Sequence, residues 1–261
     1  MPLPLKQRTA VITGAASGIG KALAKEAADQ GMRLALLDSN TDELSQLCDD
    51  LSQTTEVISA TLDVRKREQL DNFAIELKNH DIALVFANAG VMRAGTSWKL
   101  SADDWDLVFD VNVKGVMHTV SAFMPHLLAQ HSPARIVITG STSAFMARPH
   151  LAAYSSSKHA LWGIAEALQL ELAEAEAPVN VSFLAPSGVK TPIASRPTNS
   201  PTADQQKTIG ELLEAFGMPP EEVAEKTFAA LKEEKFWILP QPEFKEALIA
   251  RAESVNQETN P

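Results

Sequence analysis

The sequence contains a single cysteine, Cys48, so it has no internal disulfide framework, which fits a reducing compartment. Basic residues are also few: 23 lysines and arginines stand against 33 aspartates and glutamates, giving a net charge of −10. This balance argues against nucleic acid or an anionic membrane surface as the main partner. No apolar run is long enough to span a bilayer, and residues 1–8 lack the pattern of a signal peptide. We therefore expect a soluble, cytoplasmic protein.

Internal repeats, low-complexity segments and Gly/Ser-rich linkers are missing as well. The apolar fraction is an ordinary 45% over 261 residues, and α/β folds of about this length often form one unit. We expect one domain over residues 1–261, with a substrate-loop insert at 190–216 and a C-terminal helix and tail at 241–261.

What the sequence does contain is a regular alternation of β-rich runs and helical patterns. Near-continuous apolar strands between helices are typical of a parallel sheet that helices cover on both faces. We predict an α/β, doubly wound Rossmann-type sheet of about seven strands. The predicted strands are 9–13, 32–37, 57–62, 82–86, 135–139, 179–184 and 236–239, and the predicted helices are 22–30, 41–52, 66–79, 102–130, 154–177, 202–216, 219–234 and 243–255.

Three glycines, Gly14, Gly18 and Gly20, stand in the turn after the first predicted strand. Glycines permit a tight turn and let backbone N–H groups and the positive end of the next helix approach a pyrophosphate. Their spacing, G-x-x-x-G-x-G, differs from the commoner G-x-G-x-x-G pattern. Glycines also form strand-to-helix turns that bind nothing, so the turn alone leaves both interpretations open.

A carboxylate at the end of the second predicted strand favours the binding interpretation. Asp38 can accept hydrogen bonds from the adenosine ribose hydroxyls and would repel a 2′-phosphate. Neither Ser17 nor Ser39 supplies the positive charge that a 2′-phosphate requires. We therefore predict NAD as the cofactor rather than NADP.

The only tyrosine, Tyr154, precedes Lys158 by four positions. Apolar residues at helical spacing follow, so both side chains are expected on one face of a helix. A phenol has a pKa of about 10, and an ammonium close to it favours the phenolate and lowers that pKa. Redox chemistry of carbonyls and alcohols requires such a proton donor and acceptor beside a hydride carrier. By itself the pair also fits a surface tyrosine and lysine on an amphipathic helix.

Together these motifs resemble the short-chain dehydrogenase/reductase family, in its short NAD-dependent form. The similarity covers residues 8–240, and the order and separations of the motifs are specific although each motif alone is weak. The matching motifs are Thr13-Gly14-x-x-x-Gly18-Ile19-Gly20, Asp63-Val64, Asn88-Ala89-Gly90, Asn112, Ser141, Tyr154-x-x-x-Lys158 and Pro186 to Thr191.

The resemblance implies a catalytic role for four residues. Tyr154 would exchange a proton with the substrate oxygen, and Ser141 would hydrogen-bond the carbonyl or hydroxyl group of the substrate. Lys158 would hold the nicotinamide ribose and keep Tyr154 acidic, while Asn112 would anchor a water that links Lys158 to solvent. The implied reaction interconverts a secondary alcohol and a ketone by hydride transfer.

The resemblance also implies the cofactor contacts. Asp63 and Val64 would hold the adenine, Asn88 would steady the central strand, and the segment from Pro186 would contact the nicotinamide. The family usually has Pro-Gly where this chain has Pro186-Ser187-Gly188, which can reshape that loop. The full predicted cofactor set is Gly14, Ser17, Gly18, Ile19, Gly20, Asp38, Asp63, Val64, Asn88, Ala89, Gly90, Tyr154, Lys158, Pro186, Val189 and Thr191.

We expect a hydrophobic substrate, because basic residues are few in the loops around the expected site. Substrate choice is expected to depend on the loop after Gly90 (Val91, Met92, Arg93 and Trp98), on residues 143–151 and on the insert at 191–216. The candidates for an apolar lining are Phe145, Met146, Leu151, Ile193, Leu212, Leu213 and Phe216. Arg93, Arg148 and Arg196 are the cations able to hold a carboxylate. No metal is expected, because the histidines lack ligand spacing; only His150 is expected to line the site.

The predicted helices 102–130 and 154–177 carry more apolar and small residues than one buried stripe requires. The resemblance implies that such helices pair across two-fold axes in a homodimer or homotetramer. Two other functions stay open at this point. One is an NADP-dependent carbonyl reductase, and the other is a non-catalytic NAD-binding regulatory protein.

Overall fold

The computed structural model describes residues 3–195 and 203–259. Over these residues the strands form one seven-stranded sheet in the order β3-β2-β1-β4-β5-β6-β7, and every pairing is parallel. The predicted parallel Rossmann-type sheet is confirmed. The strands are β1 (Thr9–Thr13), β2 (Arg33–Asp38), β3 (Val57–Thr61), β4 (Ile82–Ala87), β5 (Ala134–Thr139), β6 (Val179–Leu184) and β7 (Trp237–Ile238).

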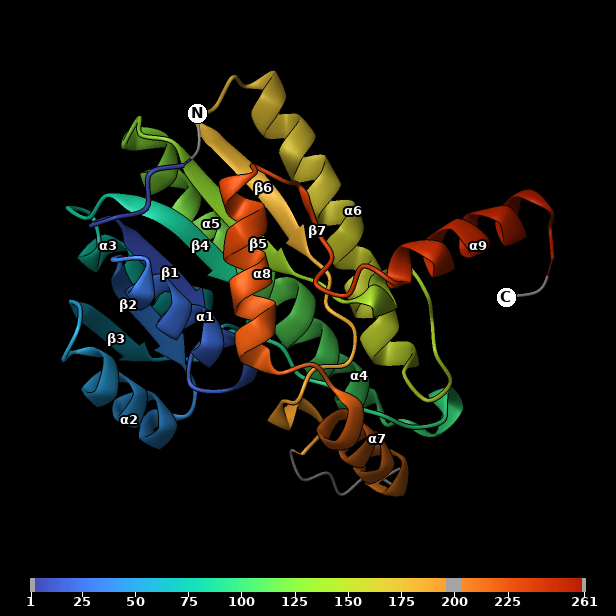
Figure 1. Cartoon of the computed structure of the whole chain (residues 1–261). Coiled ribbons are helices and arrows are strands. Elements are labelled where there is room, and N and C mark those ends of the chain that lie inside the picture. Colours follow the sequence, from blue (N-terminus) through green and yellow to red (C-terminus); the bar gives the residue numbers. More distant parts are fainter. Residues whose placement is uncertain (1–2, 196–202, 260–261) are drawn as a thin grey trace.

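Helices cover both faces of the sheet (Figure 1). Successive strand residues point to opposite faces, so Val11 packs into one apolar cluster and Ile12 into the other. The first cluster includes residues of α3 to α6, and the second includes residues of α1, α2 and α8. The helices are α1 (Gly18–Asp29), α2 (Thr41–Leu51), α3 (Arg67–Glu76), α4 (Ala102–Phe109), α5 (Gly115–Ala129), α6 (Ala152–Glu174), α7 (Ala203–Phe216), α8 (Pro220–Lys232) and α9 (Phe244–Asn256).

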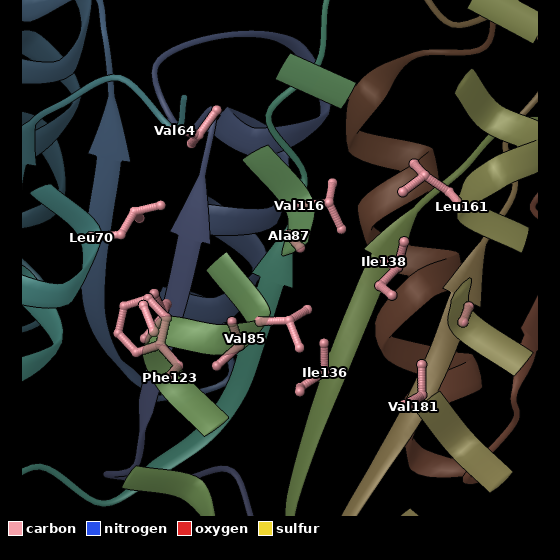
Figure 2. Packing of buried hydrophobic residues seen from close by; sticks show 14 of the residues in the cluster. Val64, Leu70, Val85, Ala87, Val116, Phe123, Ile136, Ile138, Leu161 and Val181 are labelled. Atoms are coloured by element: carbon pink, nitrogen blue, oxygen red, sulfur yellow. The ribbon is translucent and has the colours of Figure 1, made fainter. Parts of the chain in front are cut away.

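The core on the α5 side joins distant parts of the chain. Figure 2 shows Val85 of β4 and Ile136 of β5 near Phe123 of α5, with Leu161 of α6 along the same layer. Each of these four side chains is fully buried. Burying one such side chain is worth about 1.5–3 kcal/mol, so this layer stabilises the packing of these helices on the sheet.

The predicted continuous helix 102–130 is interrupted. A π-helical turn, η2 (Asp110–Lys114), separates α4 from α5, and the Gly115 N–H bonds the Asp110 carbonyl. A π turn contains one residue more than the α-helical repeat and often marks a functional site. Gly115 suits the turn because a Cβ there would lie 2.6 Å from Val64 Cγ2. Sequence periodicity missed the turn because the apolar pattern continues through it.

The order of the strands fixes where a ligand can bind. Chain connections run outward in opposite directions from β1 and β4, and α/β sheets bind ligands at such a switch point, beyond the carboxyl ends of the strands. The remaining short elements are the 3-10 turns η1 (Ser97–Lys99), η3 (Thr142–Ala144) and η4 (Pro192–Ala194). Over the part of the chain that the structure describes, no helix is both long and apolar enough to cross a membrane.

Candidate active site

A cavity of about 1310 Å³ opens at the carboxyl edge of the sheet. It is larger than the 300–1,000 Å³ common for small-ligand pockets, so it has room for a dinucleotide and a second molecule. Every residue of the predicted cofactor set lines it, as do Ser141, Tyr154 and Lys158. Of the predicted site residues, only Asn112 does not.

The turn after β1 needs its glycines for close packing. Gly14 has φ +67°, and a Cβ there would lie 2.8 Å from Ala89 Cα. A Cβ on Gly20 would overlap the Gly14 carbonyl oxygen. Helix α1 begins at Gly18 and directs its N-terminal N–H groups toward the cavity edge. The positive end of this helix can hold a pyrophosphate, as the sequence predicted for this turn.

Asn88 joins the ends of three neighbouring strands. Its Nδ2 donates to the Thr13 carbonyl at the end of β1 (3.0 Å), and its Oδ1 accepts from Thr139 Oγ1 at the end of β5 (3.2 Å). Its main-chain N–H donates to Thr13 Oγ1 (3.0 Å). These bonds fit the steadying role predicted for Asn88. They involve Thr13, which stands in the glycine-turn motif, and they add Thr139 as a supporting residue that the sequence motifs did not include.

Asp38, at the end of β2, is buried and lines the cavity. Its Oδ2 accepts from the Ala16 N–H (2.9 Å), and its Oδ1 accepts from the Asn40 N–H (2.9 Å). Both bonds hold the carboxylate in one orientation beside the glycine turn. An anion fixed there can accept further bonds from ribose hydroxyls and opposes a phosphate.

Asp63 lies at the cavity wall and is not free. Arg65 binds both of its carboxylate oxygens, with Nη2 at 2.6 Å from Oδ2 and Nε at 3.0 Å from Oδ1. The hydrogen bond from Arg65 lowers the pKa of Asp63. Arg65 itself lines the cavity, a cation that the sequence analysis did not consider for a 2′-phosphate.

Tyr154 and Lys158 stand one turn apart on α6, as their spacing predicted. Lys158 Nζ lies 5.6 Å from the centre of the Tyr154 ring and donates to the Thr139 carbonyl (2.8 Å). Ser141 lies two residues beyond the end of β5, and its side chain is close enough to the Tyr154 hydroxyl to act on its pKa. Its Oγ also accepts from the Ser143 N–H (3.1 Å). The three side chains therefore converge on one wall of the glycine-lined cavity.

The expected lowering of the tyrosine pKa is wrong for the protein alone. Burial raises the pKa of Tyr154 to about 12, and the bond from Ser141 only partly opposes this. Burial also lowers the pKa of Lys158 to about 7. Removing a group from water disfavours its charged form. Here that effect outweighs the attraction between ammonium and phenolate.

Asn112 sits behind the cavity wall, in the π turn. Its Oδ1 accepts from the Val91 N–H (2.8 Å), and its Nδ2 donates to the Val91 carbonyl (3.0 Å) and to Ser157 Oγ (3.0 Å). The side chain thus ties the loop after β4 to α6, next to Lys158. The water-anchoring role implied by the resemblance stays a prediction.

The loop from Pro186 to Thr191 is held by a residue that sequence reasoning missed. The buried Gln241 accepts from the Ser187 N–H through Oε1 (3.1 Å) and donates from Nε2 to the Gly188 carbonyl (3.3 Å). It follows β7, more than fifty residues downstream, and lines the cavity. No local pattern indicates such a contact, because it depends on where β7 joins the sheet.

The substrate end of the cavity matches the prediction in part. Leu151, Ile193, Leu212, Leu213 and Phe216 line it as expected, together with Val91, Met92 and His150.

Four other candidates do not line the cavity. Trp98 is 84% exposed. Arg93 is paired with Asp104 (3.2 Å). Phe145 packs against Trp162 in an aromatic cluster, and Met146 joins the core on the α5 side of the sheet.

Of the other two arginines expected to be able to hold a carboxylate, Arg148 lines the cavity and Arg196 lies outside the described residues. His118 and His126 bond the carbonyls of Val64 (2.9 Å) and His80 (2.8 Å). Among residues 3–195 and 203–259, no group of three acidic, histidine or cysteine side chains is arranged to hold a metal ion.

A parallel sheet with a glycine-lined cavity at its switch point is an arrangement that binds dinucleotides. The chain belongs to the short-chain dehydrogenase family, whose sequence profile matches residues 8–201.

Known proteins resemble it over most of its length. A short-chain dehydrogenase/reductase from Burkholderia phymatum, solved in complex with NAD, is 34% identical, with a TM-score of 0.93 over 99% of this chain and 97% of that one. The 1-deoxy-11-beta-hydroxypentalenate dehydrogenase of Streptomyces avermitilis is 34% identical over 90% of this chain and 84% of its own. An alcohol dehydrogenase from Thermococcus sibiricus, complexed with 5-hydroxy-NADP, is 29% identical, with a TM-score of 0.75 over 87% of this chain and 91% of that one.

Proposed function

We propose that this protein interconverts a secondary alcohol and a ketone, with NAD as the hydride acceptor or NADH as the donor. The observation that carries the proposal is that Tyr154, Ser141 and Lys158 line one glycine-lined cavity, with Lys158 Nζ 5.6 Å from the centre of the Tyr154 ring. These side chains supply a proton donor and polar contacts at one point. Chemistry at a carbonyl carbon requires such groups beside a hydride carrier.

Bound NADH would supply the hydride in the reducing direction, and bound NAD would accept it in the oxidising direction. In the reducing direction, Tyr154 donates its proton to the substrate oxygen on which negative charge develops, and Ser141 stabilises that charge by a hydrogen bond. In the oxidising direction, the Tyr154 phenolate takes the proton of the alcohol. Lys158 is held against Thr139, where its ammonium can bond the ribose and favour the phenolate.

The cofactor preference rests on Asp38. Its carboxylate is fixed by two N–H groups at the end of β2, where it can bind ribose hydroxyls and oppose a 2′-phosphate. The Burkholderia phymatum relative in complex with NAD supports this assignment. The second candidate is an NADP-dependent carbonyl reductase. The one observation that favours it is the position of the Arg65 cation in the cavity wall. We favour NAD because the Arg65 guanidinium is already bound to Asp63.

The substrate is proposed to be a neutral hydrophobic molecule. Tyr154 lies in an apolar cluster with Met92 and Leu151, and a charged group placed within that cluster would lose its hydration. Arg148 also lines the cavity but is not part of this cluster. A panel of neutral secondary alcohols, hydroxy acids and sugars with NAD, followed by NADH absorbance, tests the proposal. Activity confined to hydroxy acids or sugars would defeat the hydrophobic assignment, and a preference for NADP would defeat the cofactor assignment.

We also propose a single cytoplasmic domain that assembles as a homodimer or homotetramer. The apolar and small residues of α4, α5 and α6 support this, because they exceed what one buried stripe requires, and Leu128 and Leu170 remain exposed on these helices. Light scattering at micromolar concentration tests it, and a monomeric mass would reject the assembly.

A further inference from the structure

Helix α7 presents an apolar strip to the cavity. Ile209, Leu212, Leu213 and Phe216 recur at the spacing of one helix face, and all four line the cavity. We call these four residues the α7 strip. From its first residue to its last, the strip is roughly 10 Å long, because an α-helix rises 1.5 Å per residue.

The inner part of the strip reaches the reaction centre. Ile209 and Leu213 pack against a small apolar cluster that includes Leu151 and Tyr154. This cluster is separate from the two cores on the faces of the sheet. The surroundings of the Tyr154 side chain on the α7 side are therefore apolar.

The outer part of the strip is exposed to solvent although it faces the cavity. Leu212 is 53% exposed and Phe216 is 83% exposed. Leaving such surfaces in water forgoes the favourable free energy of burial. A ligand that extends from Tyr154 along α7 would cover both side chains.

Contacts at both ends hold the strip in this orientation. Near the start of α7, the buried Gln206 accepts from the Ala94 N–H (3.3 Å). At its end, the Gly217 N–H donates to the Leu213 carbonyl (2.9 Å), and the Met218 N–H donates to the Gly188 carbonyl (2.9 Å). The strip is therefore placed over the cavity before any ligand binds.

The charged side chains of α7 do not face the cavity. Asp204, Lys207, Glu211 and Glu214 are absent from its lining, and Lys207 pairs with Glu211 (3.9 Å). The cavity face of the helix carries only uncharged residues, the α7 strip with Gln205 and Thr208. An ionic group on the ligand would find no partner on this helix.

From these observations we infer that the substrate is an elongated neutral molecule, whose reacting carbon lies at Tyr154 and whose apolar chain lies along the α7 strip. The inference rests on the proposed alcohol dehydrogenase function and adds the length and polarity of the substrate. Ile209 and Leu213 contact the part of the chain nearest the reacting carbon, and Leu212 and Phe216 contact its far end.

A homologous series of 2-alkanols from 2-butanol to 2-decanol, oxidised with NAD, tests the inference. We expect kcat/KM of the wild type to rise by roughly three- to fourfold per added methylene, since each buried methylene is worth about 0.8 kcal/mol. The double variant Leu212→Ser/Phe216→Ser should lose at least tenfold with 2-decanol and change less than twofold with 2-butanol. The matched control is Ile75→Ser, an isoleucine of α3 that is 64% exposed and outside the cavity, and it should leave the whole series unchanged.

The outcomes separate the two proposals. Turnover of 2-butanol with no rise along the series, or an equal loss for short and long alcohols in the double variant, overturns the inference and leaves the dehydrogenase function standing. No NAD-dependent turnover of any member overturns the proposed function, and the inference with it. A steep rise in the wild type that the double variant abolishes supports both.

Discussion

The ammonium nitrogen of Lys158 lies 5.6 Å from the centre of the Tyr154 ring, and both groups are buried. Because neither charge is hydrated, the protein without cofactor favours a neutral phenol with a pKa of about 12 and a lysine with a pKa of about 7. At neutral pH the phenol therefore keeps its proton, and the lysine is the member of the pair that titrates.

Replacing Tyr154 by Phe should abolish most of the activity. The substitution keeps the ring and removes only the hydroxyl, so kcat should fall by a factor of roughly 10²–10⁴, the usual contribution of a general acid–base. NADH absorbance measures the rate, and fluorescence titration measures NAD binding, which should change less than threefold. The chain has no second tyrosine for a matched control, so thermal unfolding verifies that the variant folds. A rate within fivefold of the wild type would contradict the proposed role.

The lowered pKa of Lys158 predicts how stability depends on pH. An unfolded lysine keeps its proton up to 10.5, whereas the folded protein releases it near pH 7. Between these values the unfolded chain binds more protons, so the free energy of unfolding rises with pH, by about 1 kcal/mol per unit from this group. Below pH 7 the unfavourable contribution of the buried, protonated Lys158 to the free energy of unfolding is fully present.

Urea denaturation of the cofactor-free protein at pH 7, 8 and 9 measures this effect. The difference in unfolding free energy between wild type and Lys158→Met isolates Lys158, because other groups titrate alike in both. We expect the wild type to gain stability relative to the variant as pH rises. A difference that does not change over this range would show that Lys158 keeps an ordinary pKa.

Asp38→Asn should weaken discrimination against NADP. The variant keeps the shape of the side chain but loses the charge that opposes a 2′-phosphate, so the ratio of kcat/KM with NADP to that with NAD should rise by roughly tenfold to a hundredfold, since bonds to charged groups are worth about 1.5–3 kcal/mol. Asp42→Asn, which removes the same charge outside the cavity lining, is the matched control. An unchanged ratio would show that Asp38 does not determine the preference for NAD over NADP.

Gln241 should act as a positioning residue for the loop at the nicotinamide end. Gln241→Glu keeps the acceptor for the Ser187 N–H but faces the Gly188 carbonyl with a second acceptor. We expect KM for NAD to rise about tenfold at pH 8, since an unsatisfied buried polar group costs about 1–3 kcal/mol. The defect should diminish toward pH 5, where a protonated carboxyl can donate again.

The pH dependence distinguishes positioning from a general loss of structure. Gln257→Glu, at an exposed position beyond α9, carries the same substitution and should behave as the wild type at every pH. A defect of Gln241→Glu that is equal at pH 5 and pH 8 would mean that the lost bond to Gly188 does not set the affinity for NAD.

Local sequence patterns were sufficient to place the site residues that lie at strand ends and helix starts. Gly14, Asp38 and Ser141 follow strands whose apolar runs are readable in the sequence, and parallel strands bring their carboxyl ends together. The same reasoning misplaced Trp98 and Phe145. Residues in loops and 3-10 turns have no periodicity that tells which side faces a cavity.

The sequence by itself determined the strand and helix alternation, the glycine turn, the acidic residue after the second strand and the spacing of Tyr154 and Lys158. These features depend on residues close together in the chain. Only the tertiary structure decided that Gln241 holds the Pro186 loop and that the pKa values of Tyr154 and Lys158 move apart. Burial and long-range contact decide these properties, and both arise only when distant segments pack against one sheet.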